Sequence, residues 1–249
     1  RLRRAVAAPG IAERTALDEA ALYETFWTAN RPVVLRGAAC AWPAAGWTHA
    51  GLAERFSEVS VEVLTGRSRE RWWVDRAPLR TRIPFGDLMA ACLGPPSDDL
   101  YSDGRTELLA QPGLEPLRAE LGTLPGLVGD GIPRTWIGPA GTVTPTHHDQ
   151  STGWLVQLVG AKRVWMASPL EAALMTTADG VYNRVDPRAP SEGELREVRW
   201  DEVELRPGDA LLVPVGWWHQ VVALSPSISV SFGGFRWPNR FDWYTPGRG

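Results

Sequence analysis

Hydrophobic positions in the first half of the chain follow helical spacing in some stretches and strand spacing in others. Residues 16–29 place apolar side chains at roughly helical spacing behind Thr15, which predicts a helix with Thr15 as its N-cap. Further short helices are expected over 48–56, 84–92 and, within a Gly- and Pro-rich connector of 94–133, around 114–121. Short strands are expected over 32–35, 59–63 and 71–74.

From residue 134 the pattern changes to short apolar runs separated by turn residues. Strands are expected over 134–138, 142–149, 154–159, 162–167, 203–205, 210–213, 218–224 and 227–233, with a helical stretch at 169–175. Many short strands with turns between them are typical of a β-sandwich or barrel. We therefore predict a mainly β fold with α elements: a double-stranded β-helix (jelly roll) over 134–249 with an N-terminal α/β support over 1–133, forming a single domain of 1–249.

Composition narrows the class of protein. The 249 residues, 44% of them apolar, suffice for one sizeable core, and the formal charge of -3 with interspersed charges disfavours nucleic acid as the main partner. No apolar run approaches a membrane span, so we expect a soluble, cytoplasmic protein without a membrane partner. Cys40 and Cys92 are too few for a disulfide framework and are expected to be buried thiols in a reducing compartment.

Three of the four histidines fall in two short segments, 144–149 and 214–219. Side chains alternate along a strand, so His147 and Asp149 share one face while His148 points to the other. With His219 from a second strand they form a two-His, one-carboxylate set, which leaves octahedral positions open and suits non-haem Fe(II) rather than a closed zinc site. The alternative for such short motifs is a chance tripeptide and a packed histidine.

Lys162 is the only lysine in the chain, whereas all other basic side chains are arginine. It lies in a predicted core strand, where a buried ammonium is costly unless it meets an anion. A compact point charge in a narrow space suits a carboxylate. Chance placement at a harmless position is the alternative.

Four blocks carry a resemblance to a known family: WIGPAGTVTPTHHDQ (136–150), LVQLVGAKRVW (155–165), RPGDALLVPVGWWHQV (206–221) and SISVSFGGFRWPN (227–239). They resemble bacterial cupin-like JmjC proteins, Fe(II)- and 2-oxoglutarate-dependent oxygenases related to the asparaginyl hydroxylase of the hypoxia response. The segment 31–44 extends the resemblance toward the N-terminus.

The resemblance implies His147, Asp149 and His219 as iron ligands, with 2-oxoglutarate and O2 as co-substrates. It also implies that Lys162 pairs with the distal carboxylate of 2-oxoglutarate, and that Thr144 and Tyr101 hydrogen-bond to it. Two departures concern the iron-proximal end of the co-substrate. Relatives often carry asparagine where this chain has Gly153 and Ser231.

The expected activity is hydroxylation of a C–H bond on a protein or peptide side chain. Demethylation, and oxidation of a small molecule, a free amino acid or a modified nucleoside, stay open. So does a non-catalytic cupin that binds metal or a small acid, which Gly153 and Ser231 would favour. Oligomeric state, including a homodimer, is left open.

Five tryptophans lie near the motifs: Trp136, Trp154, Trp165, Trp217 and Trp218. Their side chains either clamp a substrate or fill the barrel.

Overall fold

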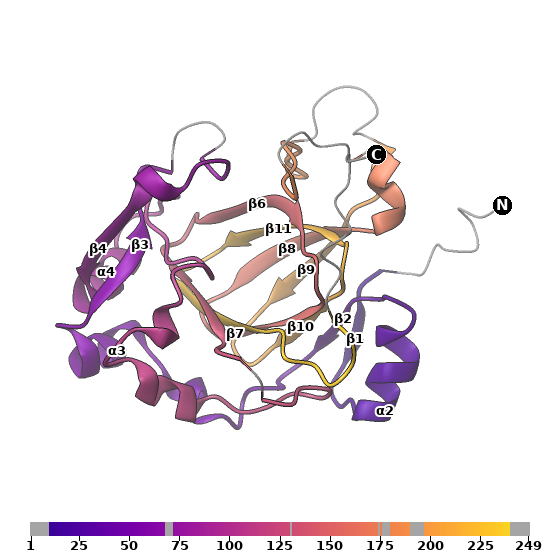
Figure 1. The fold of residues 1–249 in the computed structure, drawn as a ribbon, viewed down its shortest axis with the longest axis horizontal. Coiled ribbons are helices and arrows are strands. Elements are labelled where there is room, and N and C mark those ends of the chain that lie inside the picture. Colours follow the sequence, from indigo (N-terminus) through magenta and orange to yellow (C-terminus); the bar gives the residue numbers. More distant parts are fainter. Residues whose placement is uncertain are drawn as a thin grey trace.

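The computed structural model describes residues 10–67, 72–129, 131–173, 175, 180–189 and 197–239. Within these residues two sheets face each other, one six-stranded in the order β1-β2-β10-β7-β12-β5 and one four-stranded in the order β6-β11-β8-β9 (Figure 1). This is the expected double-stranded β-helix. The barrel strands are β5 (Arg134–Gly138), β6 (Val143–His148), β7 (Gly153–Val159), β8 (Lys162–Ala167), β9 (Asp201–Leu205), β10 (Ala210–Val213), β11 (Trp218–Ala223) and β12 (Ser227–Phe232).

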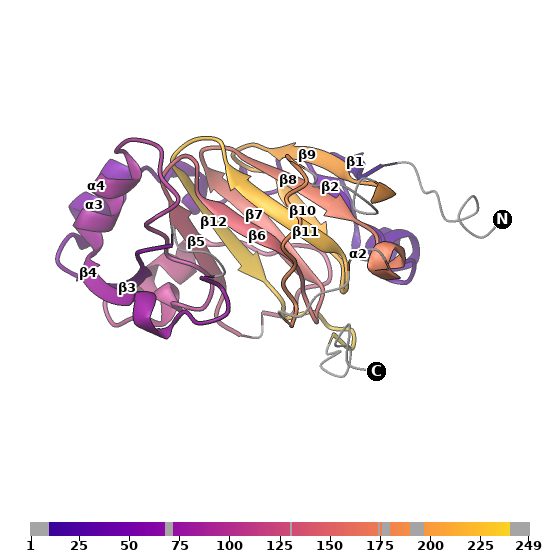
Figure 2. The same ribbon diagram turned by 90° about the horizontal axis from the view of Figure 1, so that it is seen from above.

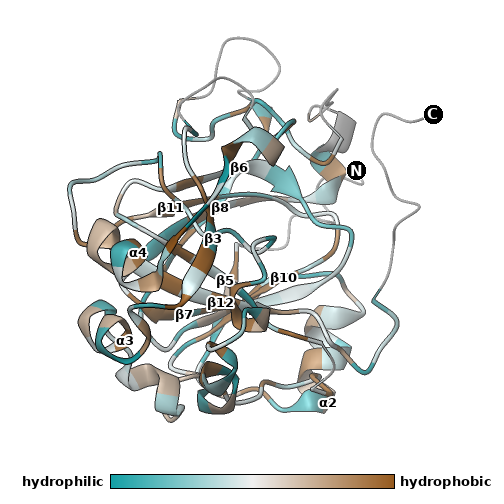
Figure 3. Cartoon of the chain, turned by 60° about the vertical axis from the view of Figure 1, so that its left-hand side comes forward, coloured by the Kyte–Doolittle hydropathy of each residue, from teal (hydrophilic) through white to brown (hydrophobic). Residues whose placement is uncertain are grey.

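The barrel strands form because their side chains fit a pleated, largely buried surface. In β8 buried and half-buried residues alternate over the first four positions, while β10 and β11 are buried throughout. Trp154 and Val156 on β7 pack with Leu212 on β10 and Ile228 on β12 in the largest core cluster. Figure 3 shows hydrophobic residues along these interior strands.

An N-terminal layer flanks the barrel on two sides, with the helices and strands of residues 49–92 on one side and those of residues 12–35 on the other (Figures 1 and 2). Two of its strands, β1 and β2, extend the six-stranded sheet through pairing of β2 with β10, so the predicted support and core share a sheet. Leu88 of this layer belongs to the same core cluster as Trp154. Its elements are β1 (Ala12–Arg14), α2 (Glu19–Leu22), β2 (Val33–Leu35), α3 (His49–Phe56), β3 (Ser60–Leu64), β4 (Arg80–Pro84) and α4 (Phe85–Cys92).

The helices keep their predicted places, with one change of cap. Asp18, not Thr15, caps α2 by accepting a hydrogen bond from Ala21 N at 2.7 Å, and the chain continues as a π-helical turn over Tyr23–Trp27. Thr48 caps α3 in the same way through Gly51 N at 3.0 Å. Short 3-10 helices lie at Pro43–Gly46, Ala77–Leu79, Leu108–Ala110, Glu115–Glu120 and Pro169–Ala173.

Two expectations from the N-terminal half were wrong. The strand that pairs with β3 is β4, whereas residues 72–74 form a turn and residue 71 lies outside the described residues. Cys40 is exposed, although Cys92 is buried as expected, and both thiols are free.

Among the described residues, no helix has the length and apolar character needed to cross a membrane. The cytoplasmic location stays a prediction.

Candidate functional site

Two histidines face each other across neighbouring strands. His147 on β6 and His219 on β11 are register partners in an antiparallel pair, and their ring centroids lie 4.1 Å apart. Asp149 follows directly after β6. Its carboxylate oxygens lie 4.0 Å from His147 Nε2 and 3.9 Å from His219 Nε2. Two ligand atoms bound to one ion at about 2.1 Å lie at most about 4.2 Å apart, so both distances are short enough for a shared ion.

Each histidine ring is oriented by a backbone carbonyl. His147 Nδ1 lies 2.8 Å from Pro145 O, and His219 Nδ1 lies 2.9 Å from Trp217 O. A carbonyl oxygen only accepts, so Nδ1 carries the proton in both rings and the Nε2 lone pair faces the carboxylate. Burial, and then the neighbouring His219, lower the pKa of His147 to about 3. The ring is therefore neutral at physiological pH, as a metal ligand must be.

Among the described residues, these three form the group of side chains that could hold a metal ion, and one ligand atom from each lies within 4.8 Å of the others. Both histidines are buried, whereas the Asp149 side chain is 54% exposed at the mouth of the site. His148 packs edge-on against Trp218 with centroids 4.7 Å apart and belongs to no such group, as the strand alternation predicts. The donor set, two imidazoles and a carboxylate, fits Fe(II).

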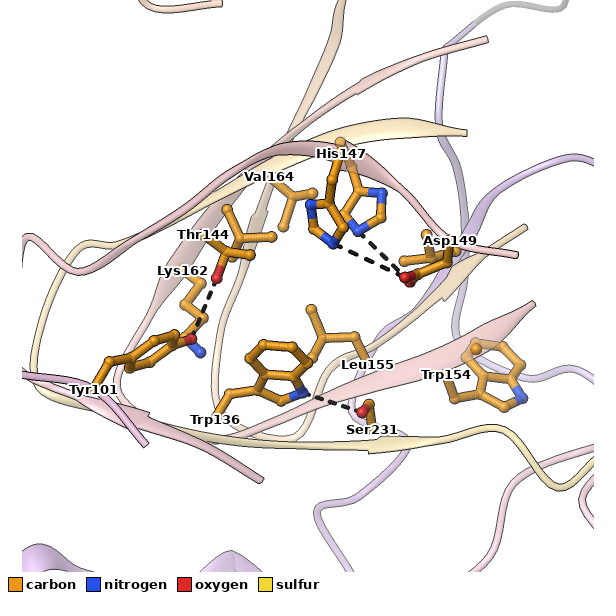
Figure 4. A pocket seen from close by; sticks show the side chains of 14 residues that line it. Tyr101, Trp136, Thr144, His147, Asp149, Trp154, Leu155, Lys162, Val164 and Ser231 are labelled. Atoms are coloured by element: carbon orange, nitrogen blue, oxygen red, sulfur yellow. Dashed lines mark hydrogen bonds and ion pairs between the residues drawn. The ribbon is translucent and has the colours of Figure 1, made fainter. Parts of the chain in front are cut away.

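At the other end of the same cavity lies Lys162, the first residue of β8. Its side chain is buried, and no carboxylate among the described residues pairs with it. Its Nζ lies 5.8 Å from the centroid of the Tyr101 ring, and Tyr101 Oη lies 3.5 Å from Thr144 Oγ1. Figure 4 shows these three side chains grouped away from His147 and Asp149. Burial lowers the pKa of Lys162 to about 7, a cost that a bound anion would offset.

The inner cavity, of about 70 Å³, joins these two ends and is lined by Trp136, Leu155 and Val164 between them (Figure 4). It opens into an outer cleft of about 680 Å³ that shares His147, Asp149 and Trp136 with it. Such a shape, a narrow inner site behind a wider mouth, suits a small co-substrate inside and a larger substrate outside.

The two departures from the family pattern lie at this mouth. Ser231 on β12 accepts a hydrogen bond from Trp136 Nε1 at 3.1 Å, which leaves its O–H as a donor at the cavity wall. Gly153 on β7 also lines the cavity, and a Cβ there would meet nothing nearer than Phe232 O at 3.5 Å. A Cβ at this position would therefore make only an ordinary van der Waals contact.

The other tryptophans near the motifs mostly pack. Trp154 and Trp218 are buried; Trp154 Nε1 donates to Pro125 O at 3.1 Å and Trp217 Nε1 donates to Asn30 O at 2.8 Å. Trp136 is the member of this set that lines both the inner cavity and the outer cleft. The five tryptophans near the motifs therefore do not all line the inner cavity or the outer cleft.

Sequence reasoning missed a group at the outer cleft. The Tyr182 ring stacks on the His147 ring with centroids 5.4 Å apart, and its backbone pairs with that of His147. Arg76 hydrogen-bonds to the Tyr182 hydroxyl and to Asp103, which links the N-terminal layer to the residue that pairs with β6. No local spacing signals this group, because its three members come from separate loops.

The chain matches the cupin-like domain family over residues 19–233. It is 36% identical over 107 residues (40% of this chain, 26% of the relative) to Jumonji C domain-containing protein 5 of Drosophila melanogaster. It is 38% identical over 104 residues (39% and 24%) to lysine-specific demethylase 8 of Xenopus tropicalis. It is 29% identical over 238 residues (89% and 54%) to lysine-specific demethylase JMJ30 of Arabidopsis thaliana. The chain thus spans a quarter to a half of the length of these relatives.

The fold and the relatives with JmjC and demethylase names define the class as JmjC/cupin 2-oxoglutarate oxygenases. The chain belongs to the cupin-like domain family, which confirms the resemblance seen in the sequence. Enzymes of the JmjC class use Fe(II), 2-oxoglutarate and O2, and the His147, Asp149 and His219 cluster is the candidate place for the iron.

Proposed function

We propose that the protein is an Fe(II)- and 2-oxoglutarate-dependent oxygenase that hydroxylates a C–H bond on a protein or peptide side chain. The observation that carries the proposal is the position of Lys162. A buried ammonium without a counter-charge among the described residues lines the same cavity as His147, Asp149 and His219. A cation in a narrow apolar space calls for an anion, and the metal-binding end calls for a chelating one.

In this proposal His147, Asp149 and His219 hold the metal through Nε2, a carboxylate oxygen and Nε2. Lys162, Tyr101 and Thr144 hold the distal carboxylate of 2-oxoglutarate by charge and hydrogen bonds, while Val164 and Leu155 exclude water around its methylene groups. Ser231 lies toward the iron-proximal end. When bound, the metal with 2-oxoglutarate and O2 supplies the oxidation of an unreactive C–H bond, with succinate and CO2 as co-products.

A macromolecular substrate is supported by the size of the outer cleft and by relatives whose names include lysine-specific demethylase. Hydroxylation and demethylation begin alike, since oxidation of an N-methyl group gives a hydroxymethyl that breaks down to formaldehyde. The products therefore separate the two: a stable gain of one oxygen atom for hydroxylation, formaldehyde and loss of the methyl group for demethylation.

The test is succinate formation by purified protein with Fe(II), 2-oxoglutarate and O2, with and without peptide libraries. His219→Ala and Lys162→Ala should abolish it, and Arg163→Ala, on the same strand as Lys162 but ion-paired to Glu202 outside the barrel, should not. Succinate formation that is equal in all four proteins would mean that the cavity is not the active site.

A non-catalytic metal- and acid-binding cupin is the second candidate, because Gly153 and Ser231 lack the amides that relatives often carry. This second candidate predicts that the protein binds Mn(II) and 2-oxoglutarate tightly but forms no succinate with any substrate. Small-molecule substrates, including free amino acids, are tested in the same assay by replacing the peptides.

A further inference from the structure

Arg67 is a fully buried guanidinium that lies outside the proposed ligand set. Its side chain has 0% exposure, and it follows β3 just after Gly66, whose φ of +72° turns the chain. Its Nε has no hydrogen-bond partner within the described part of the chain. Keeping a charge in such a place is costly, and an apolar side chain of similar volume is often tolerated equally well at such sites. The contacts of the Arg67 guanidinium therefore indicate why a charge is kept at this position.

Arg67 contacts the backbone of Val143, the first residue of β6. Its Nη2 donates to Val143 O at 2.5 Å, and its Nη1 lies 3.1 Å from Asp98 Oδ1. The same Asp98 oxygen accepts a hydrogen bond from Val143 N at 2.7 Å. Both backbone polar groups of Val143 are thus held, and the next residue is Thr144.

The same guanidinium packs against Tyr101. Its central carbon lies 4.8 Å from the centroid of the Tyr101 ring and 4.1 Å from that of Trp72. The Tyr101 backbone pairs with that of Leu64 through hydrogen bonds of 2.8 and 3.0 Å, three residues before Arg67. One side chain therefore contacts the ring of Tyr101 and the backbone beside Thr144, the two residues whose hydroxyls meet at 3.5 Å.

Arg67 and Lys162 are two buried cations that both face the Tyr101 ring, at 4.8 and 5.8 Å from its centroid. The ion pair of Arg67 is with Asp98, whose side chain is 37% exposed and so partly screened by water. This end of the barrel thus carries more buried positive than buried negative charge among the described residues.

We propose that Arg67 is a positioning residue that selects a co-substrate with a distal carboxylate: it fixes the Tyr101 and Thr144 hydroxyls and adds a second buried positive charge behind them. The inference rests on the proposed 2-oxoglutarate site and deepens it. It assigns selection of a dicarboxylate over a monocarboxylate to a residue that does not line the inner cavity.

The experiment measures two dissociation constants calorimetrically in the Mn(II)-loaded protein without O2. One ligand is 2-oxoglutarate; the other is 2-oxopentanoate, in which a methyl group replaces the distal carboxylate. Arg67→Met should weaken 2-oxoglutarate about tenfold and leave 2-oxopentanoate and Mn(II) nearly unchanged, because the charge acts at the distal end alone. Arg67→Lys, which keeps the charge but loses the fork, should fall between.

Arg82→Met is the matched control, since Arg82 is an exposed arginine on β4, which pairs with the strand that precedes Arg67, and it binds Ser60 and Gln111. It should change neither constant. Equal weakening of both acids by Arg67→Met, or no weakening of either, would overturn the inference while leaving the proposed function standing. If the unmodified protein and Arg67→Met both fail to bind 2-oxoglutarate, the inference and the proposed function fall together. Should Arg67→Met not fold, Arg67→Lys alone decides by the same comparison.

Discussion

Replacing Lys162 by methionine removes the ammonium group from the inner cavity while keeping most of the volume of the side chain. The expected partner of the ammonium is the distal carboxylate of 2-oxoglutarate, since no carboxylate among the described residues pairs with it. Truncating one partner of a buried charge pair costs about 2 to 5 kcal/mol. At about 1.4 kcal/mol per decade, 2-oxoglutarate should bind roughly 30- to 3,000-fold more weakly.

The same change should stabilise the ligand-free protein. Burial lowers the pKa of Lys162 from 10.5 to about 7. Between these values the unfolded chain holds a proton that the folded protein has largely lost, so this group's contribution to stability rises as pH increases through that window. At pH 7 the folded protein carries the penalty, on the order of 4 kcal/mol, and methionine removes it.

Two measurements check the expected loss of affinity and the expected gain of stability in Lys162→Met. Calorimetry of 2-oxoglutarate in the Mn(II)-loaded protein gives the affinity, and urea unfolding without ligand gives the stability. Affinity of the unmodified protein should also weaken as pH rises above about 7, because the ammonium loses its proton, whereas the methionine variant should lack this dependence. Arg163→Met, one position away and ion-paired with Glu202, is the control. Unchanged affinity in Lys162→Met would refute the reasoning.

Three further outcomes are expected. His219→Ala should lose bound metal on dialysis, measured by elemental analysis, because two remaining ligands hold Fe(II) weakly; full metal content would contradict this. In the folded protein a maleimide should label Cys40, which is exposed, and spare Cys92, whose pKa burial raises to about 12; mass spectrometry that finds Cys92 labelled would count against this. Gly153→Asn should keep its melting temperature, since a Cβ there meets nothing nearer than 3.5 Å, and a clear drop would show that the space is not free.

The barrel strands were predictable because their burial imposes a pattern that local sequence carries. β8 and β10 show it directly, by alternation and by a continuous apolar run. β4 shows no such pattern, since most of its residues are exposed and its side-chain contacts with β3 include the exposed polar pairs Arg80–Glu62 and Arg82–Ser60. The apolar 72–74 segment suggested a strand instead, but Trp72 is buried against the Arg67 guanidinium, a contact that no local pattern reports.

The candidate site was also only partly predictable from the sequence. Strand alternation alone placed His147 and Asp149 on one face and His148 on the other. The set with His219 was inferred from residue types, and the pairing of Lys162 with 2-oxoglutarate from the resemblance, because local spacing does not give the sheet order that brings these residues together. Tyr182, Arg76 and Arg67 were missed because each acts through loops or through a neighbour rather than through a motif. The roles of all these side chains in binding stay predictions.

The pairing of His147 with His219 across the β6 and β11 ladder has a kinetic consequence. Strands so distant in sequence pair only after a long loop has closed, which is the slow part of folding in β-rich proteins. An ion held by both rings can be captured only once that ladder exists. Metal uptake during refolding should therefore lag behind the formation of the local helices, and a coloured ion such as Co(II) would report barrel closure in real time.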